Sequence, residues 1–214
     1  MVSSTLGFGG LAIRNPWDVI LPEYGDDARA TTAEAKGEAI SQWELSEVAL
    51  SRLYASVCDV LPKERHDKAK SYGTPLNFKD RLDRLERQGE SFFAAKCSQM
   101  LEGDFEDVIQ LARMLSMRRN EIVHSFIKGI TYERTFREDE NGQTIVFKAK
   151  FFVVPPDYTA RKFDDQHRPG FFYSSVEMDH YRTEFGCFQA AALNLSIRLD
   201  GGPIEPFGRK HPVL

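Results

Sequence analysis

The chain has 214 residues, and its hydrophobic fraction of 42% and aromatic fraction of 12% suit a folded core rather than general disorder. Its 28 basic and 32 acidic side chains leave a net charge of −4, which disfavours indiscriminate electrostatic binding to nucleic acid. No stretch approaches about 20 consecutive apolar residues and no signal-peptide pattern begins the chain, so a cytoplasmic protein without a membrane partner is expected.

The cysteines and histidines predict neither a metal site nor a bound cofactor. Cys58, Cys97 and Cys187 show no spacing typical of zinc ligands. Each cysteine lies among apolar neighbours, so we expect buried free thiols in a reducing compartment. The histidines show no metal-ligand spacing either.

An irregular arm is predicted over residues 1–30, because Gly and Pro interrupt this segment repeatedly. A helix is predicted to follow from Thr31 to Leu61. Thr31 and Glu34 have the T-x-x-E pattern of a capping box, and Pro62 ends the helix. Its apolar residues recur at helical spacing and define one face: Ile40, Trp43, Leu50, Tyr54, Val57, Cys58 and Leu61.

The middle of the chain predicts a loop and two further helices. Residues 62–76 are charged and contain Gly and Pro, which is typical of a loop. A second helix is predicted over 77–101, and the sequence EGD then breaks it. Asp104 is the expected cap of a third helix over 105–128, which Gly129 ends.

After the third helix the apolar period changes to two, which predicts a β-hairpin over residues 130–154. The expected strands are residues 130–136 and 144–154, and Asn141-Gly142 between them is a strong turn signal. An isolated hairpin is only marginally stable in water, so we expect this one to pack on the helices or on a partner chain.

The last helix is predicted over 174–199, because Ser174 and Glu177 have the pattern of another capping box and the sequence DGGP ends the helix. The fold class expected is all-α. Four long amphipathic helices, with the hairpin inserted between the third and the fourth, predict an up-down four-helix bundle over residues 31–200. A short Pro-rich tail over 201–214 follows.

Polar residues in the segment MRRNEIVHSF interrupt the apolar face of the third predicted helix. At about 100° per residue, Arg119 projects into the middle of the apolar stripe, Asn120 lies at its edge, and His124 lies outside it. An arginine directed into a core must be paired, because an uncompensated buried charge is strongly destabilising. Glu47 lies within the apolar stripe of the first helix, so we predict that Glu47 and Arg119 meet.

The sequence RNEIVH, from Arg119 to His124, resembles the signature of the HEPN superfamily. In that signature an Arg and a polar residue, typically Asn, are followed by three residues and a His on the third helix of a four-helix bundle. The preceding LARMLSMR, the first-helix sequence QWELSE and the strand pair after the third helix are similar to the same family. The resemblance covers residues 31–200 and implies a HEPN-like bundle.

The resemblance further implies a metal-independent endoribonuclease that acts as a homodimer, in which two copies of the motif form one site. Arg119, Asn120 and His124 are then the catalytic residues. An imidazole suits proton transfer at a ribose 2′-OH or at the leaving oxygen, and a guanidinium suits the charge that develops on phosphorus. Asn120 orients His124 or the phosphate. Arg118 is a candidate phosphate contact, and Glu47 is a candidate binding residue that is more readily explained as structural.

Two functions remain open on the sequence. Nucleases of this family recur in toxin–antitoxin and anti-phage systems, so the resemblance implies an RNA substrate and an antitoxin partner, with no cofactor and no DNA. The alternative is a non-catalytic HEPN-like binding or scaffold protein, whose motif holds the bundle together or binds a nucleotide or partner protein. The acidic net charge favours the alternative, and the complete motif favours the nuclease.

Overall fold

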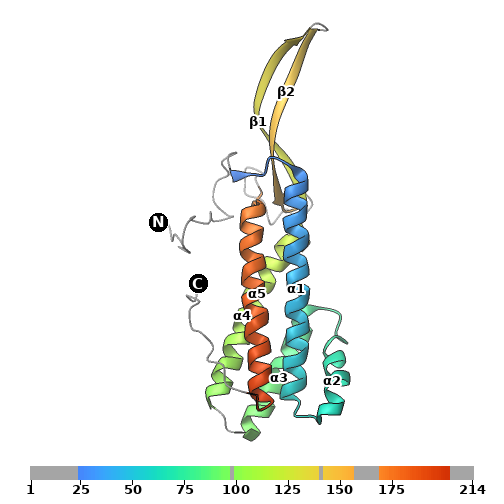
Figure 1. Ribbon diagram of the computed structural model, residues 1–214, viewed down its shortest axis with the longest axis vertical. Helices are drawn as coiled ribbons and strands as arrows, with labels where there is room; N and C mark the ends of the chain where they lie inside the picture. The colour runs from blue at the N-terminus through green and yellow to red at the C-terminus, as the bar shows by residue number, and fades with distance from the viewer. Residues whose placement is uncertain (1–23, 97–98, 140–141, 157–168, 203–214) are drawn as a thin grey trace. The chain divides into compact units, whose positions relative to one another are not determined.

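The structure is a computed structural model and describes residues 24–96, 99–139, 142–156 and 169–202; the side chains of residues 99 and 133–147 are not described. The described residues are mostly helical and include a two-stranded antiparallel sheet (Figure 1). The elements in chain order are α1 (Arg29–Val57), a 3-10 turn (Pro62–Glu64), α2 (Arg65–Tyr72), α3 (Phe78–Lys96), α4 (Gln99–Val123), β1 (Phe126–Asp139), β2 (Gly142–Val154) and α5 (Ser175–Leu199). The prediction of a mostly helical chain with a hairpin before the last helix is confirmed.

The chain divides into two compact units. The first unit contains the residues up to 41 and residues 119–183, and the second contains residues 42–118 and those from 184 onward. The boundaries fall inside α1, α4 and α5, within the range that the sequence suggests as one bundle. No helix in the described part of the chain is both long enough and apolar enough to cross a membrane.

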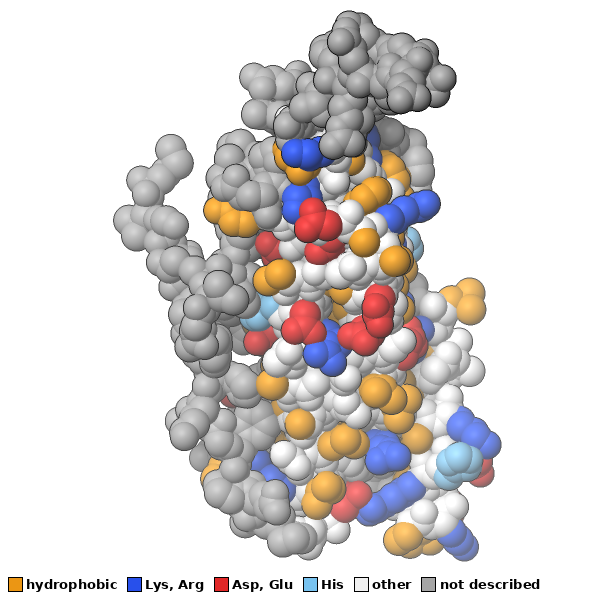
Figure 2. Space-filling model, turned by 45° about the horizontal axis from the view of Figure 1, so that its top comes forward, with side chains coloured by type: hydrophobic (Ala, Val, Ile, Leu, Met, Phe, Trp, Pro, Cys, Tyr) orange, Lys and Arg blue, Asp and Glu red, His pale blue; other side chains and the backbone are white. Residues whose placement is uncertain are grey.

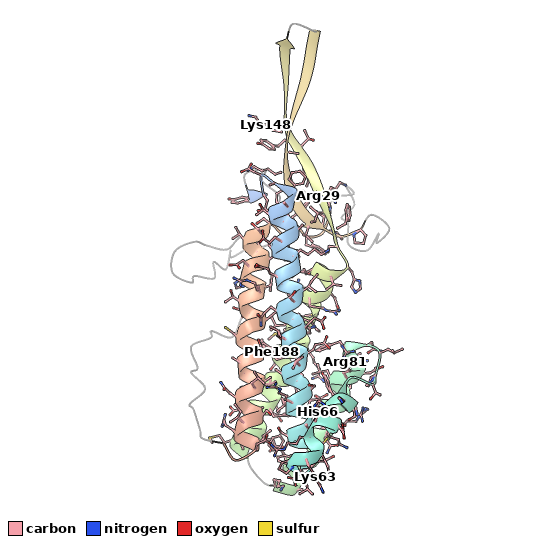
Figure 3. The ribbon with its side chains drawn as sticks, turned by 45° about the vertical axis from the view of Figure 1, so that its right-hand side comes forward. Arg29, Lys63, His66, Arg81, Lys148 and Phe188 are labelled. Carbon is pink, nitrogen blue, oxygen red and sulfur yellow. The ribbon has the colours of Figure 1, made fainter. Side chains whose placement is uncertain are left out.

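The core of the second unit is centred on Trp43 of α1, which is fully buried. Its ring meets Phe78 of α3 edge to face, with 5.1 Å between ring centroids, and Phe185 of α5 at 5.2 Å. Phe188, labelled on α5 in Figure 3, stacks on the same ring at 6.2 Å. The Ser46 hydroxyl donates to the carbonyl of Phe185 over 2.9 Å, so α1 contacts both α3 and α5 in this unit.

A glycine marks the close approach of α3 and α4. Gly89 of α3 is buried, and a Cβ atom added to it would lie 2.2 Å from Cζ of Phe105 on α4. The Phe105 ring is itself only 3% exposed and packs against Phe93 of α3 at 5.4 Å. The ring therefore has little room to move away from a larger residue at position 89.

We expect Gly89→Ala to lower the free energy of unfolding by up to about 2 kcal/mol, because the added methyl group overpacks the contact with Phe105 at a cost of about 1–3 kcal/mol. The gain in helix propensity, about 1 kcal/mol, offsets only part of this loss. Urea denaturation measures the change. Gly37→Ala is the matched control, because a Cβ at Gly37 of α1 meets nothing within 4 Å and should stabilise. Equal gains in stability for both variants would show that the contact with Phe105 is not tight.

In the first unit the base of the hairpin is packed. Phe152 of β2 is fully buried and meets Phe172 edge to face, with 6.0 Å between ring centroids. The residues on either side of Phe152 exchange backbone hydrogen bonds with Asp26 and Tyr173. The hairpin was predicted to pack on the helices or on a partner chain, and its base packs on the segments that directly precede α1 and α5. The far end of the hairpin closes with Asp139 opposite Gly142, and the predicted turn residue Asn141 lies outside the described residues.

Asp26 joins the start of α1 to the start of α5 in the first unit. Its carboxylate accepts hydrogen bonds from the hydroxyl of Thr32 at 2.7 Å, and from the backbone N–H and hydroxyl of Ser175 at 2.9 and 2.6 Å. The first N–H groups of a helix have no partner within the helix, so Asp26 caps α5 from a distant part of the chain. The predicted capping box is also confirmed, because the Glu177 carboxylate accepts from the backbone N–H of Ser174 at 2.7 Å.

α1 differs from the prediction at both ends. It begins at Arg29, so Thr31 and Glu34 lie inside the helix instead of capping it. It ends at Val57 rather than at the predicted Leu61. The chain leaves the helix just before Asp59, whose φ of +50° lies in the left-handed region, where an α-helix cannot continue.

Tertiary contacts explain two further errors in the second unit. The charged segment 62–76, predicted as a loop, contains α2. The ring of Tyr72 at the end of α2 is buried and packs on Tyr54 of α1 at 5.8 Å, which holds this short helix in place. The predicted helix break at Asp104 is also wrong, since α4 continues through that residue. The Asp104 carboxylate does not cap a helix and lies 2.5 Å from Arg198 of α5.

Candidate functional site

The motif residues Arg119, Asn120 and His124 lie at the C-terminal end of α4, in the first unit. The backbone N–H of His124 donates the last helical hydrogen bond, to the carbonyl of Asn120 at 3.1 Å. α4 ends at Val123 and β1 begins at Phe126. His124 therefore lies in the short link between helix and strand.

This helix end corrects the prediction that the third helix continues to Gly129. Gly129 lies inside β1, opposite Phe151 of β2, and a Cβ atom there would lie 3.2 Å from the Phe151 ring. The segment from Phe126 to Thr131 has apolar residues compatible with a helix or a strand. Pairing with β2 decides between them, because every residue of this segment lies opposite a residue of β2.

The three motif side chains differ in exposure. Asn120 and His124 are exposed, and Arg119 is half-buried. The guanidinium of Arg119 donates from Nη1 to the Oδ1 atom of Asn120 over 3.1 Å, and its Nε atom is buried. The arginine is thus oriented at the helix end, while the imidazole of His124 remains accessible to solvent.

Lys36 of α1 also contributes to this site, although the helical pattern did not identify it. Its ammonium donates to the carbonyl of Ser125 over 2.5 Å, and Ser125 directly follows His124. Lys36 is half-buried, and burial lowers the pKa of its ammonium from the ordinary value. Among the described residues Lys36 has no carboxylate partner, so it adds positive charge next to the link that carries His124.

The last turn of α4 is held against the base of the hairpin by Glu121. Its carboxylate accepts a hydrogen bond from the hydroxyl of Tyr173, a residue that is fully buried and paired to β2. Its backbone carbonyl accepts from the hydroxyl of Ser125. These contacts immobilise the backbone on both sides of His124 while leaving the imidazole exposed.

Glu47 is paired as predicted for a buried acid, but with a different cation. The carboxylate accepts from Arg81 of α3 and, over 2.8 Å, from Nε1 of Trp43. Arg81 projects from α3 toward α1 (Figure 3). The prediction that Arg119 is the partner of Glu47 is corrected accordingly. The side chains of Glu47 and Arg81 are only 14% and 15% exposed, so the structure places Glu47 in a structural ion pair.

Arg81 connects three parts of the second unit. Besides Glu47, it reaches the carbonyls of Pro75 and Leu76 in the link before α3, both at 3.3 Å. The buried phenol of Tyr72 on α2 lies near the same ion pair. Burial and the charge of Glu47 raise the pKa of Tyr72, and the charge of Arg81 opposes that shift.

The remaining predicted residues have simpler positions. Arg118 is half-buried in α4, and it belongs to the second unit. Cys58 and Cys187 are free thiols as predicted, half-buried rather than buried, and burial raises the pKa of each. Cys97 lies outside the described residues. Within the described ranges, no group of three His, Cys, Asp or Glu side chains is arranged to hold a metal ion.

Comparison of the chain with models of protein families, with curated proteins and with solved structures gave no match. A function must therefore be argued from the chain's own residues. The strongest candidate site is the end of α4. There the guanidinium of Arg119 is bonded to the exposed Asn120, the exposed His124 follows one helical turn later, and Lys36 binds the carbonyl of the next residue.

Proposed function

We propose that the chain is a cytoplasmic HEPN-like four-helix bundle with a hairpin insertion, and that as a homodimer it cleaves RNA without a metal ion. Contacts within the second unit support the bundle. α1 contacts α3 through Trp43 and α5 through Ser46, while α4 contacts α3 through Phe105 and α5 through Asp104. Each of the four long helices then has two helical neighbours, which is the arrangement of a four-helix bundle.

The observation that carries the nuclease proposal is the exposed imidazole of His124, one helical turn beyond Asn120, the residue that accepts a hydrogen bond from Arg119. The exposure of His124 in the link between α4 and β1 leaves the imidazole accessible to a substrate. Lys36 adds a second positive charge to the same place. An accessible imidazole with nearby cationic groups suits a substrate that carries a phosphodiester.

The reaction proposed is an internal transfer to phosphorus. His124 takes the proton from a ribose 2′-OH, the 2′-oxygen attacks the adjacent phosphorus, and the bond from phosphorus to the 5′-oxygen breaks. His124 of the partner subunit donates a proton to the departing 5′-oxygen. Arg119, held by Asn120, stabilises the negative charge on the phosphorane oxygens. The products are a 2′,3′-cyclic phosphate and a 5′-hydroxyl end.

Incubation of the purified full chain with mixed RNA in EDTA tests this proposal. We expect fragments that end in 2′,3′-cyclic phosphate or its hydrolysis product and begin with 5′-hydroxyl. Fragments with 5′-phosphate and 3′-hydroxyl ends would point to a different reaction, and intact RNA would favour a non-catalytic protein.

We expect Arg119→Lys to reduce the cleavage rate about 10²-fold, because lysine keeps the charge but loses the planar set of donors. The measurement is the initial rate of cleavage of one labelled RNA under EDTA. Arg87→Lys on the exposed part of α3 is the matched control and should retain the full rate. An unchanged rate for Arg119→Lys would remove the guanidinium from the mechanism.

The second candidate function is a non-catalytic HEPN-like binding or scaffold protein. The hydrogen bond of Arg119 within its own chain and its buried Nε atom favour this reading. It predicts that Arg119→Lys alters stability, measured by urea denaturation, and that no variant of the motif changes the integrity of RNA. In the nuclease reading, the resemblance to toxin–antitoxin proteins adds an antitoxin partner that suppresses cleavage.

A further inference from the structure

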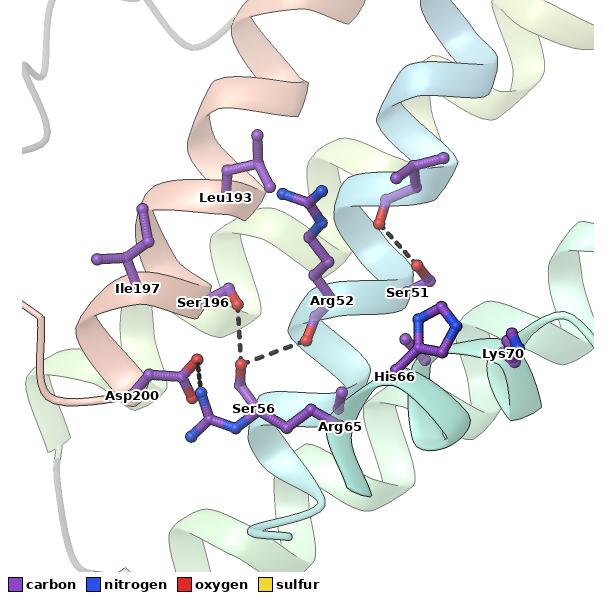
Figure 4. A pocket seen from close by; sticks show the side chains of 13 residues that line it. Ser51, Arg52, Ser56, Arg65, His66, Lys70, Leu193, Ser196, Ile197 and Asp200 are labelled. Atoms are coloured by element: carbon purple, nitrogen blue, oxygen red, sulfur yellow. Dashed lines mark hydrogen bonds and ion pairs between the residues drawn. The ribbon is translucent and has the colours of Figure 1, made fainter. Parts of the chain in front are cut away.

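A cavity of about 660 Å³ lies in the second unit and is lined by α1, α2 and α5 (Figure 4). It shares no residue with the RNEIVH motif, and the proposed RNA cleavage does not use it. Its volume falls within the range of about 300–1,000 Å³ that small-molecule sites occupy in proteins.

The lining of this cavity has an excess of basic side chains. Arg52 comes from α1, and Arg65, His66 and Lys70 come from α2. The acidic lining residue, Asp200, is paired with Arg65 at 2.5 Å. Arg52 and Lys70 have no ion pair within the described part of the chain. Two uncompensated cations at one cavity are notable in a chain of net charge −4.

The position of Arg52 suits contact with a bound anion. In Figure 4 its side chain extends from α1 into the space between α1 and α5, while Arg65 turns toward Asp200. Arg52 is exposed and makes no side-chain hydrogen bond among the described residues. Its five donors are therefore available to a carboxylate, phosphate or sulfonate group.

The cavity also has apolar lining residues on all three helices. They are Val48, Ala55, Ala69, Leu193 and Ile197. Val48 and Ile197 remain 50% and 49% exposed, which is high for branched apolar residues. Figure 2 shows hydrophobic and basic side chains exposed next to one another toward the lower end of the visible face.

The polar groups at the floor of the cavity are already satisfied. The hydroxyls of Ser56 and Ser196 are bonded to each other at 2.8 Å, and Ser56 also donates to the carbonyl of Arg52. A ligand therefore gains most from contact with the apolar lining residues and from ionic contact at the rim. A fully polar ligand would leave the apolar lining residues without a partner.

We propose that this cavity binds a small amphipathic anion. The apolar body lies against Leu193 and Ile197, and the anionic group is held by Arg52, while Lys70 adds positive charge at the α2 side of the cavity (Figure 4). Every ligand of this class has an apolar group that carries one carboxylate, phosphate or sulfonate. The ligand is either a free acid or part of a larger metabolite. This site is independent of the proposed nuclease function.

Isothermal titration of the full chain with dodecanoate, below its micelle concentration, tests the proposal. We expect saturable binding with one site per chain, at least about 10-fold tighter than binding of dodecanol or inorganic phosphate. If dodecanol binds as tightly as dodecanoate, the cations do not contribute to the affinity. Phosphate binding as tightly would remove the role of the apolar lining residues, and absence of saturable binding would overturn the site itself.

Two variants locate the binding in this cavity. Arg52→Gln with Lys70→Gln should weaken dodecanoate binding about 10- to 100-fold, because the charge-assisted contact of Arg52 and the positive charge of Lys70 are both lost. Ala69→Phe keeps every charge but fills the cavity, and should weaken binding at least about 10-fold. Lys79→Gln with Arg87→Gln removes two exposed cations of α3 outside the lining and should leave the affinity unchanged. Equal effects of the two double variants, or no effect of Ala69→Phe, would place the binding elsewhere.

Discussion

Arg81→Leu is expected to lower the free energy of unfolding by about 3 kcal/mol, the low end of the range for breaking a buried ion pair. The substitution leaves the Glu47 carboxylate, whose side chain is 14% exposed, with Trp43 Nε1 as its remaining hydrogen-bond donor. A carboxylate in such surroundings loses most of its hydration without compensation. Urea denaturation at neutral pH should show a lower midpoint with an unchanged slope.

Two further variants separate the ion pair from other effects of Arg81. Glu47→Leu combined with Arg81→Leu should recover part of the lost stability, because no uncompensated charge remains. Recovery should be incomplete, since the carbonyls of Pro75 and Leu76 still lose their donor. Arg87→Leu on the exposed part of α3 should change stability by no more than about 0.5 kcal/mol. Equal effects of Arg81→Leu and Arg87→Leu on the free energy of unfolding would show that the ion pair does not stabilise the fold.

His124→Ala is expected to reduce RNA cleavage about 10²- to 10⁴-fold, the usual contribution of a general acid or base. The proposed reaction uses the imidazole of each protomer, one to accept a proton and one to donate it. Stability should change by no more than about 0.5 kcal/mol, because the side chain is exposed and makes no hydrogen bond or ion pair among the described residues. Cleavage rates in EDTA and urea denaturation of the same preparations measure both quantities.

The matched control for this variant is His66→Ala, which removes an exposed histidine of α2 in the second unit. It should cleave RNA at the rate of the unmodified protein. Full cleavage by His124→Ala would exclude His124 from the mechanism. A comparable loss in both variants would mean that the measured nuclease does not depend on the motif.

The elements that the sequence predicted well are those specified by local chemistry. The start of α5 follows from Ser174 and Glu177, which are three residues apart and bond to each other. Its end follows from Gly201, which adopts a φ of +79°, and from Gly202, whose N–H returns to the carbonyl of Ile197 over 2.8 Å. In both cases all the interacting groups lie within a few residues of one another.

For the candidate site, the sequence identified the motif but not its surroundings. Arg119, Asn120 and His124 are close in the chain, so all three lie at the end of α4, where the side chains of Arg119 and Asn120 are bonded and the backbone of His124 bonds to Asn120. Lys36 reaches the same link from α1, and nothing in its own neighbourhood distinguishes it from an exposed helix lysine. The sequence also showed that Glu47 needs a cation, without showing which one.

By itself, then, the sequence determined the long helices, the hairpin and the order in which they occur, because apolar periodicity and capping residues act over a few positions. Only the tertiary structure decided three features. Arg81 neutralises Glu47, the buried ring of Tyr72 holds α2 in place, and the chain changes from α4 to β1 before Phe126. Each of these outcomes depends on an energy shared with a distant segment: a desolvated charge, a buried ring or a strand partner. The spacing of residues along the chain reports only local interactions, so it cannot indicate which distant segment supplies the partner.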